Sequence, residues 1–595
     1  MNIVLAAHRP CAARVLRIAA LLLAAPLAHS QPTHSFAFTV RADQSLGRVN
    51  ANVLGTNLEW FNYGDSVLTG EGTHRPALID FARQMQPTVL RYWAGDLYEW
   101  YRGMPGQMGP NVVPFGDYAA QPTWFGTQQF LEFSKAIGAS SMVTLNVYQG
   151  WIGGADFAPG TDAVPAIHAA GWVEQINSRV AQGWPSSIAG QGNLGRVGYW
   201  EVGNEPYLQS PAEPGAPNGR SIAPERFAAR AAQTAQAITA VDPAAQVLLP
   251  LSPGVRNGKA ASAYWRNASG AADTDHYIHT VLGAMPAASI DAISLHTGYM
   301  PGADAGRVDL GPNVDRLQCP ATYYWAAMSS APSVAANMDA IDAVVKARYS
   351  SRFRSGVPQY ALTEYGPVFS SPSNPVLANT GGACAADSYL GYTQADLSRW
   401  GYTPAGGLYV ADLIRLLAAR PNLMVANHWS LHNNHGADGT HRFGAFVDTA
   451  EYRNDPKPIY QVLQLWSGVL LPAGTTRVGV VATARQTRAT ASIGYAEART
   501  IPVVEAFATR QTVGASQRLQ VLMINKDPAR AGVGKLTLRG ATLVAATHST
   551  LSSSALLGDD GRAAFTSTRG ALSPSGQSVS ITMPPGSVAV VTLQL

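Results

Sequence analysis

The stretch VGYWEVGNEP (197–206) is a short apolar run that ends in polar residues. Runs of this kind recur between about residues 50 and 460, and several are continuously apolar, as expected for strands buried on both faces of a parallel sheet. Helical stretches separate them, and the clearest is Pro224–Val241, which has Pro in its first turn and is stopped by Asp242-Pro243. The predicted strands are Val53–Trp60, Thr88–Trp93, Ser141–Tyr148, Val197–Asn204, Gln246–Pro250, Ile290–His296, Gln359–Glu364 and Met424–Leu431, and the other two clear helices are Thr127–Ile137 and Ser333–Arg348. Eight strands with intervening helices predict an α/β fold, a (β/α)8 TIM barrel over residues 49–468.

The composition changes after about residue 470, where Thr, Val, Ser and Gly dominate and helical periodicity fades. Short β-rich runs with turn residues between them predict a C-terminal antiparallel β-sandwich over residues 469–595. Residues 31–48 precede the first barrel strand and contain FAFTV (36–40), which we expect to join that sandwich. The predicted sandwich strands are Leu519–Asn525, Lys535–Leu538, Ala541–Ala546 and Ser587–Leu595.

Charge is sparse and nearly balanced, with 42 basic and 38 acidic residues and a net charge of +4. A nucleic-acid-binding protein needs a basic surplus or stripe, and the sequence has neither. The 46% hydrophobic content excludes a disordered chain. The composition therefore indicates a globular protein that binds no nucleic acid.

The N-terminus has the pattern of a secretory signal peptide, which we expect to span residues 1–30. Three Arg and no acidic residue precede the apolar run IAALLLAAPLA (18–28), and Ala28 and Ser30 put small residues before the cleavage point. The alternative is a membrane anchor, but the run is shorter than the roughly 20 residues needed to span a bilayer. The sequence predicts a secreted or periplasmic protein with no membrane span after cleavage.

Export of the protein would determine which cysteines remain and whether they can form a disulfide. Cys11 leaves with the signal peptide, so Cys319 and Cys384 remain as an even pair in an oxidising compartment. A disulfide between them is one possibility, and two free thiols are the other.

Two of the predicted strands end in a glutamate. The fourth runs into Asn204-Glu205-Pro206, and the seventh contains Thr363-Glu364-Tyr365. Strands four and seven lie opposite each other in an eight-stranded barrel, and catalytic residues lie at the C-terminal strand ends. Two opposed carboxyl groups, one protonated and one ionised, are what glycoside hydrolysis requires. Glu205 and Glu364 are therefore the candidate catalytic pair; the alternative is that one or both are solvated surface acids.

Around these motifs the chain resembles the clan A glycoside hydrolases, and most closely the α-L-arabinofuranosidases of family fifty-one. WEVGNEPYL (200–208) is similar to their acid/base motif and ALTEYGP (361–367) to their nucleophile motif. Further similar segments are NVLGTNLEW (52–60), VLRYWAGDLYEW (89–100), FLEFSKAIGASSMVTLNV (130–147), DAISLHTGY (291–299), KPIYQVLQLWS (457–467), LQVLMINKDP (519–528) and MPPGSVAVVTL (583–593). The resemblance covers most of the chain and implies a retaining mechanism.

Residue by residue, the resemblance implies a role for each matched position. Glu205 would be the acid/base, Glu364 the nucleophile, Asn204 a hydrogen-bond partner of the sugar 2-OH, His296 and Tyr299 the lining beside the nucleophile, and Glu59 and Arg91 the groups that hold sugar hydroxyls or orient Glu364. Trp429, at the end of the eighth strand, is the candidate for stacking on a sugar ring; core packing is the alternative.

The chain departs from the family at two places. Tyr92-Trp93-Ala94-Gly95-Asp96 stands where the family has Pro-Gly-Gly, and Glu59-Trp60 stands where it has an acid-His pair. Both changes bring bulk to the sugar-binding end and leave the glycone open.

Nothing in the sequence calls for a cofactor. His428, His432, His435 and His441 form a cluster, but their spacing fits no familiar metal pattern, so we predict no metal site. Gly-x-Ser-x-Gly is absent, which leaves a serine nucleophile without support.

Three functions remain open. The first is an exported arabinofuranosidase acting on a polysaccharide or oligosaccharide. The second is another glycosidase of the clan: a β-xylosidase, a galactofuranosidase or an endo-glucanase or xylanase. The third is a non-catalytic glycan-binding protein, which would tolerate loss of either Glu205 or Glu364, whereas both are present. The oligomeric state, the linkage cleaved and the position attacked stay open.

Overall fold

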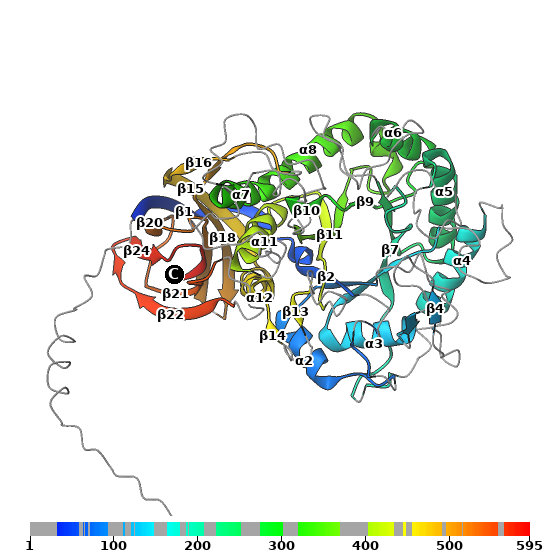
Figure 1. The fold of residues 1–595 in the computed structure, drawn as a ribbon, viewed down its shortest axis with the longest axis horizontal. Coiled ribbons are helices and arrows are strands. Elements are labelled where there is room, and N and C mark those ends of the chain that lie inside the picture. Colours follow the sequence, from blue (N-terminus) through cyan, green and yellow to red (C-terminus); the bar gives the residue numbers. More distant parts are fainter. Residues whose placement is uncertain are drawn as a thin grey trace, which may run out of the picture.

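In the computed structural model the chain forms an α/β barrel beside a β domain (Figure 1). The residues described are 33–58, 64, 66–69, 72–92, 111–113, 121–123, 125–147, 163–178, 186–188, 190–207, 222–251, 274–301, 319–368, 403–432, 444–447, 455–490, 496–514, 516–556 and 564–595. Among these residues, no helix is both long enough and apolar enough to cross a membrane.

Eight parallel strands close the barrel, which confirms the predicted fold class. They follow the order β2-β3-β6-β7-β8-β9-β11-β12, and β12 pairs with β2 to complete the ring. A short extra strand, β10 (Gly298–Pro301), extends alongside β11. The barrel strands are β2 (Gly55–Leu58), β3 (Val89–Tyr92), β6 (Ser140–Thr144), β7 (Val197–Glu201), β8 (Gln246–Pro250), β9 (Ala292–Leu295), β11 (Tyr360–Val368) and β12 (Leu423–His428).

The first barrel strand begins two residues later than the predicted Val53–Trp60. Residues Ala51–Leu54 form a 3-10 turn, because the side chain of Asn50 accepts a hydrogen bond from the backbone N–H of Asn52 and caps it. The strand therefore begins at Gly55.

Helices surround the barrel, as Figure 1 shows. Helix α3 (Thr127–Ile137) and helix α5 (Pro224–Val241) have the predicted limits. Helix α5 begins with Pro in its first turn and ends at the extended Asp242, before Pro243. The other helices are α2 (Pro76–Met85), α4 (Val164–Val173), which continues into the π-helical turn Glu174–Ser178, α6 (Thr274–Ala284), α7 (Cys319–Met328), α8 (Ser330–Arg348), the 3-10 turn Ser350–Arg352, α11 (Pro404–Leu417) and α12 (Pro458–Leu470).

Small and medium apolar side chains fill the inside of the barrel. Six strands each contribute one buried residue to this cluster, which consists of Val89, Met142, Leu248, Ala292, Ala361 and Val425. The interior is thus a packed core below the strand ends, and polar chemistry is confined to the mouth.

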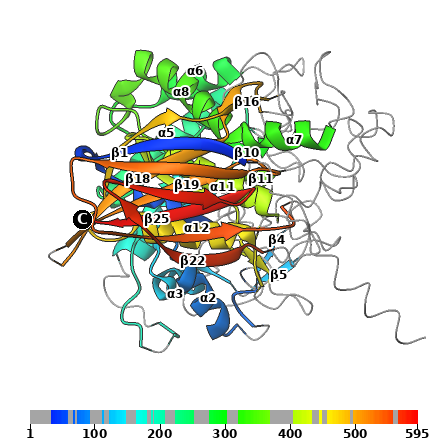
Figure 2. The ribbon, with the colours of Figure 1, turned by 90° about the vertical axis from the view of Figure 1, so that its left-hand side faces the viewer.

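The C-terminal domain is built on one ten-stranded sheet, onto which Figure 2 looks. The sheet folds back on itself, since β24 contacts both β22 and β25. N-terminal strand β1 (Thr33–Arg48) lies between β15 and β20. The other strands are β15 (Thr476–Ala484), β18 (Val504–Val513), β19 (Ser516–Asn525), β20 (Ala531–Arg539), β21 (Ala545–Ser552), β22 (Thr566–Leu572), β23 (Pro574–Ser575), β24 (Ser578–Met583) and β25 (Ser587–Gln594). Three two-stranded pairs complete the fold: β4 (Asn111–Val113) with β5 (Gln121–Thr123), β13 (Phe446–Val447) with β14 (Asp455–Pro456), and β16 (Thr487–Ala489) with β17 (Thr500–Pro502).

Two details differ from the predicted antiparallel sandwich. The pair β1–β20 is parallel, because β1 enters the sheet from the far end of the chain and not through a hairpin. The strand predicted at 541–546 begins only at Ala545, since Gly540 adopts a left-handed turn and the backbone N–H of Leu543 bonds the side chain of Gln577.

Buried charges join the two domains. Asp412 on α11 accepts hydrogen bonds from Lys526, which follows β19, and from Arg415, at 2.5 and 2.7 Å. Arg415 also reaches Glu505 on β18. The side chains of Asp412 and Lys526 are each only 1% exposed. Since an unpaired buried charge is costly, this network fixes the β domain against the barrel.

Candidate active site

Glu205 follows strand β7 at the C-terminal mouth of the barrel. Between them the chain makes a tight turn, in which Gly203 has a φ of +94° and a Cβ there would lie 2.6 Å from Val147. Glu205 itself has a φ of +48°, a left-handed conformation that costs a non-glycine residue about 1–3 kcal/mol. The turn aims the Glu205 side chain across the mouth.

Glu364 lies within strand β11 and is 4% exposed. One carboxyl oxygen of Glu364 and one of Glu205 lie within 4.8 Å of each other. The barrel therefore brings together the two carboxyl groups that the sequence places on separate strands. The separation is close to the roughly 5–5.5 Å of retaining glycosidases and well below the roughly 6.5–9.5 Å of inverting ones.

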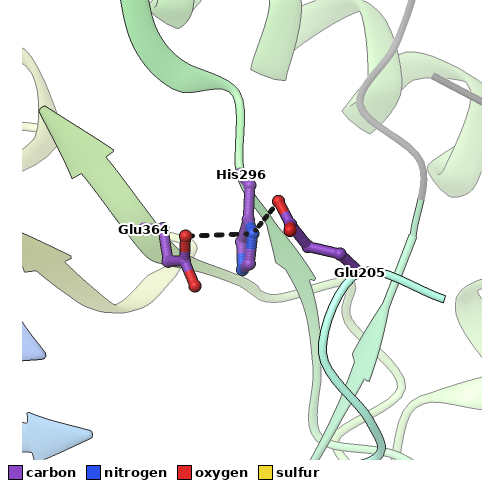
Figure 3. A group of neighbouring side chains, drawn as sticks. All are labelled: Glu205, His296 and Glu364. Carbon is purple, nitrogen blue, oxygen red and sulfur yellow. Dashed lines mark hydrogen bonds and ion pairs between the residues drawn. The ribbon is translucent and has the colours of Figure 1, made fainter. Parts of the chain in front are cut away.

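His296, just after β9, stands between the two glutamates (Figure 3). Its Nδ1 lies 2.9 Å from Oε1 of Glu205 and 3.5 Å from Oε2 of Glu364. Burial acts to lower the pKa of His296, but the nearby carboxylates of Glu364 and Glu205 outweigh it and raise that pKa above its ordinary value.

Arg91 on β3 is fully buried beneath the glutamates and bonds four side chains. Its Nη1 donates to Glu364 at 2.7 Å and to Asn57 at 3.0 Å, its Nε to Glu201 at 2.7 Å and its Nη2 to Asn204 at 2.7 Å. Burial opposes the charge, but Glu201 and Glu364 raise the pKa of Arg91, so it stays cationic. A fixed cation at 2.7 Å favours the ionised form of Glu364. With all four partners satisfied, Arg91 orients the side chains of the site.

Asn204 is oriented by this network. Its Oδ1 accepts from Arg91, so its Nδ2 points the other way. Nδ2 is buried and has no hydrogen-bond partner among the described residues. An unpaired buried donor costs free energy, and a ligand hydroxyl beside Glu205 would satisfy it.

The remaining sequence-predicted residues are placed only in part. Trp429 directly follows β12, is 7% exposed and donates its backbone N–H to the carbonyl of Tyr365. Tyr299 lies on β10, and Cys319 begins α7, but their side chains lie outside the description, as do all of Glu59 and Cys384.

Sequence reasoning missed three polar residues that complete the site: Glu201, Thr363 and Asn57. Thr363 donates its hydroxyl to Glu201 at 2.8 Å, and Asn57 donates to the carbonyl of Thr363 at 3.0 Å. One signal pointed to Glu201, because its charge, like that of Arg91, interrupts a strand that is otherwise apolar, and buried charges need a partner.

Glu205, His296 and Glu364 each offer one ligand atom, and these three atoms are close enough to surround a cation. Arg91 already neutralises Glu364, however, and Glu205 is bonded directly to His296. We therefore interpret the cluster as acid–base machinery. Of the four clustered histidines, His428 and His432 are buried at the end of β12, and His435 and His441 lie outside the described residues. Burial lowers the pKa of His428 to about 3.

No protein-family model and no curated protein matches the sequence. Solved structures match the fold. The α-L-arabinofuranosidase of Thermotoga maritima, in complex with arabinose, aligns with a TM-score of 0.62 at 16% identity, over 94% of this chain and 100% of its own. The family 51 arabinofuranosidase of Xanthomonas axonopodis pv. citri gives 0.59 at 16% identity, again over 94% and 100%. The chain has the fold of the family 51 α-L-arabinofuranosidases.

A second family shares this architecture. The family 44 xyloglucanase of Paenibacillus polymyxa, in a structure with xyloglucan, aligns with a TM-score of 0.51 at 14% identity, over 94% of this chain and 100% of its own. The fold is therefore common to α-L-arabinofuranosidases and to a xyloglucanase.

Proposed function

We propose that this chain is a retaining glycoside hydrolase in which Glu364 is the nucleophile and Glu205 the acid/base. The observation that carries the proposal is the approach of the two carboxyl groups to within 4.8 Å at the barrel mouth. The separation leaves room for an anomeric carbon and its glycosidic oxygen, and too little for a water on the opposite face of the sugar.

The surroundings suit each glutamate to its role. Arg91 keeps Glu364 ionised and directs it, so that one carboxylate oxygen attacks the anomeric carbon. Glu205 donates a proton to the departing oxygen and then, as a carboxylate, takes one from the water that releases the sugar. The amide Nδ2 of Asn204 has no hydrogen-bond partner among the described residues, and such a donor suits the sugar 2-OH.

For the glycone, α-L-arabinofuranoside is the proposed substrate, in an oligosaccharide or polysaccharide. The support is the arabinofuranosidase fold together with the quoted sequence motifs. An endo-glucanase or xylanase is the second candidate, because the fold is also that of a family 44 xyloglucanase.

The test is kinetics on a panel of aryl glycosides, including arabinofuranosides, xylosides and galactofuranosides, alongside polysaccharides. Glu364→Ala is expected to abolish turnover in a folded protein. Glu205→Ala is expected to retain more activity on aryl glycosides with good leaving groups than on natural substrates, since those need less protonation. Glu174→Ala is the matched control, since Glu174 is exposed on the π-helical turn. Full activity of Glu364→Ala would remove the nucleophile assignment.

Export is the second part of the proposal. The basic, apolar and small-residue pattern of residues 1–30 supports a cleaved signal peptide. Expression followed by cell fractionation and N-terminal sequencing is expected to give a protein outside the cytoplasm that starts near Gln31. A cytoplasmic product with an intact N-terminus would contradict this.

A further inference from the structure

His296 is bonded through both ring nitrogens. Nδ1 lies 2.9 Å from Oε1 of Glu205, and Nε2 lies 3.0 Å from Oγ1 of Thr363. A neutral imidazole carries one proton, on one nitrogen or the other, and the partners decide which.

The hydroxyl of Thr363 has one hydrogen to give. It lies 2.8 Å from Oε1 of Glu201, whose other oxygen is held by Arg91 through Nε and Nη2 at 2.7 and 2.6 Å. A carboxylate paired with an arginine in this way is ionised and can only accept. Thr363 must therefore give its hydrogen to Glu201, and its oxygen must accept one from Nε2 of His296.

We propose that Glu201 and Thr363 are positioning residues that hold His296 in its Nε2–H form, so that the acid proton of the reaction is shared between Nδ1 of His296 and Glu205. With Nε2 already protonated, Nδ1 has a lone pair facing Glu205. The proton sits either on Glu205, which then donates to Nδ1, or on Nδ1, which then donates to the Glu205 carboxylate. The two arrangements contain the same number of protons, so the pair titrates as one unit.

The charges around His296 favour retention of this shared proton. Glu364 on β11 and Glu205 after β7 attract it, Arg91 on β3 repels it, and Glu201 on β7 acts through Thr363. Burial alone lowers the pKa of His296, and the two facing glutamates reverse that shift. This relay, which consists of Glu201, Thr363, His296 and Glu205, thus keeps Glu205 supplied with a proton while Glu364 stays ionised.

The kinetic test of this inference rests on the proposed function, because it measures glycosidase turnover. Thr363→Val keeps the shape of the buried side chain but removes the acceptor of Nε2–H. His296 then prefers the Nδ1–H form, which donates to an ionised Glu205 and leaves one acid proton fewer. The alkaline limb of the pH profile of kcat/KM is expected to move down by about one pH unit. Thr363→Ser is expected to restore it.

Thr144→Val is the matched control. Thr144 is also a buried barrel threonine, and its hydroxyl donates to the backbone carbonyl of Tyr92. It is expected to leave the pH profile unchanged. A Thr363→Val profile identical to that of the unmodified protein would overturn the inference.

A second measurement needs no turnover. Nitrogen NMR of protein labelled in its histidine rings distinguishes Nε2–H from Nδ1–H, and the His296→Asn variant identifies the signal. The unmodified protein is expected to show Nε2–H and Thr363→Val to show Nδ1–H. An Nε2 without a proton in the unmodified protein would overturn this inference alone, whereas a lack of glycosidase activity would overturn the proposed function.

Discussion

Replacing Arg91 with lysine tests the centre of the site while keeping its positive charge. Arg91 donates to Glu201, Glu364, Asn204 and Asn57 at once, and its side chain is fully buried. The planar guanidinium of arginine reaches groups on several sides through three nitrogen atoms. A lysine ammonium has its three donors on a single atom and cannot reach all of these groups. At least two of the charge-assisted bonds are lost, and the carboxylates stay buried.

The expected cost follows from that count. Hydrogen bonds to charged groups contribute roughly 1.5–3 kcal/mol each, so Arg91→Lys should lower the free energy of unfolding by about 3 kcal/mol. Asn204 and Glu364 also lose their common anchor. Because misplacing a catalytic group by about 1 Å can cost about a hundredfold in rate, kcat/KM is expected to fall by about that factor.

Denaturant unfolding and aryl-glycoside kinetics measure the two effects separately. Arg354→Lys is the matched control, since Arg354 also bonds several groups, among them Asp291 and the carbonyl of Pro243, but at the opposite end of the barrel. It should lose stability and keep its kcat/KM. A folded Arg91→Lys protein with unchanged kcat/KM would refute the positioning role of Arg91.

Three further outcomes follow from the structure. Gly203→Ala places a Cβ against the side chain of Val147 in the turn before Glu205, and it should reduce kcat/KM. Gly138 is also left-handed, but a Cβ there would meet nothing within 4 Å, so Gly138→Ala should only reduce the melting temperature. The pKa of His428 is about 3 in the folded protein and ordinarily 6.5, so between these pH values the unfolded chain binds a proton that the folded chain does not. The stability present above pH 6.5 is therefore lost as the pH falls towards 3. His428→Phe should reduce that loss in acid-unfolding curves followed by fluorescence. Asp412→Ala removes the carboxylate that pairs with the buried Lys526, and it should lower the free energy of unfolding by about 3–5 kcal/mol. The kcat/KM of the folded protein should stay unchanged.

The sequence by itself determined the barrel, and it singled out the two glutamates that the structure brings together at the barrel mouth. Strands buried on both faces must be apolar throughout, and helix limits are set by local signals, which is why α3 and α5 begin and end at the predicted residues. The polar ends of strands four and seven were visible for the same reason, since Glu205 and Glu364 stand directly beside apolar runs.

Only the tertiary structure decided how these groups act on one another. Arg91, Glu201, His296 and Thr363 come from four different strands or strand ends, and their contacts depend on the closure and register of the barrel. A hydrogen-bond network is a matter of distances below about 3.2 Å, and sequence spacing does not encode distance between strands that are far apart along the chain. The identity of the acid pair was therefore local information, whereas the placement of its proton is a property of the closed barrel.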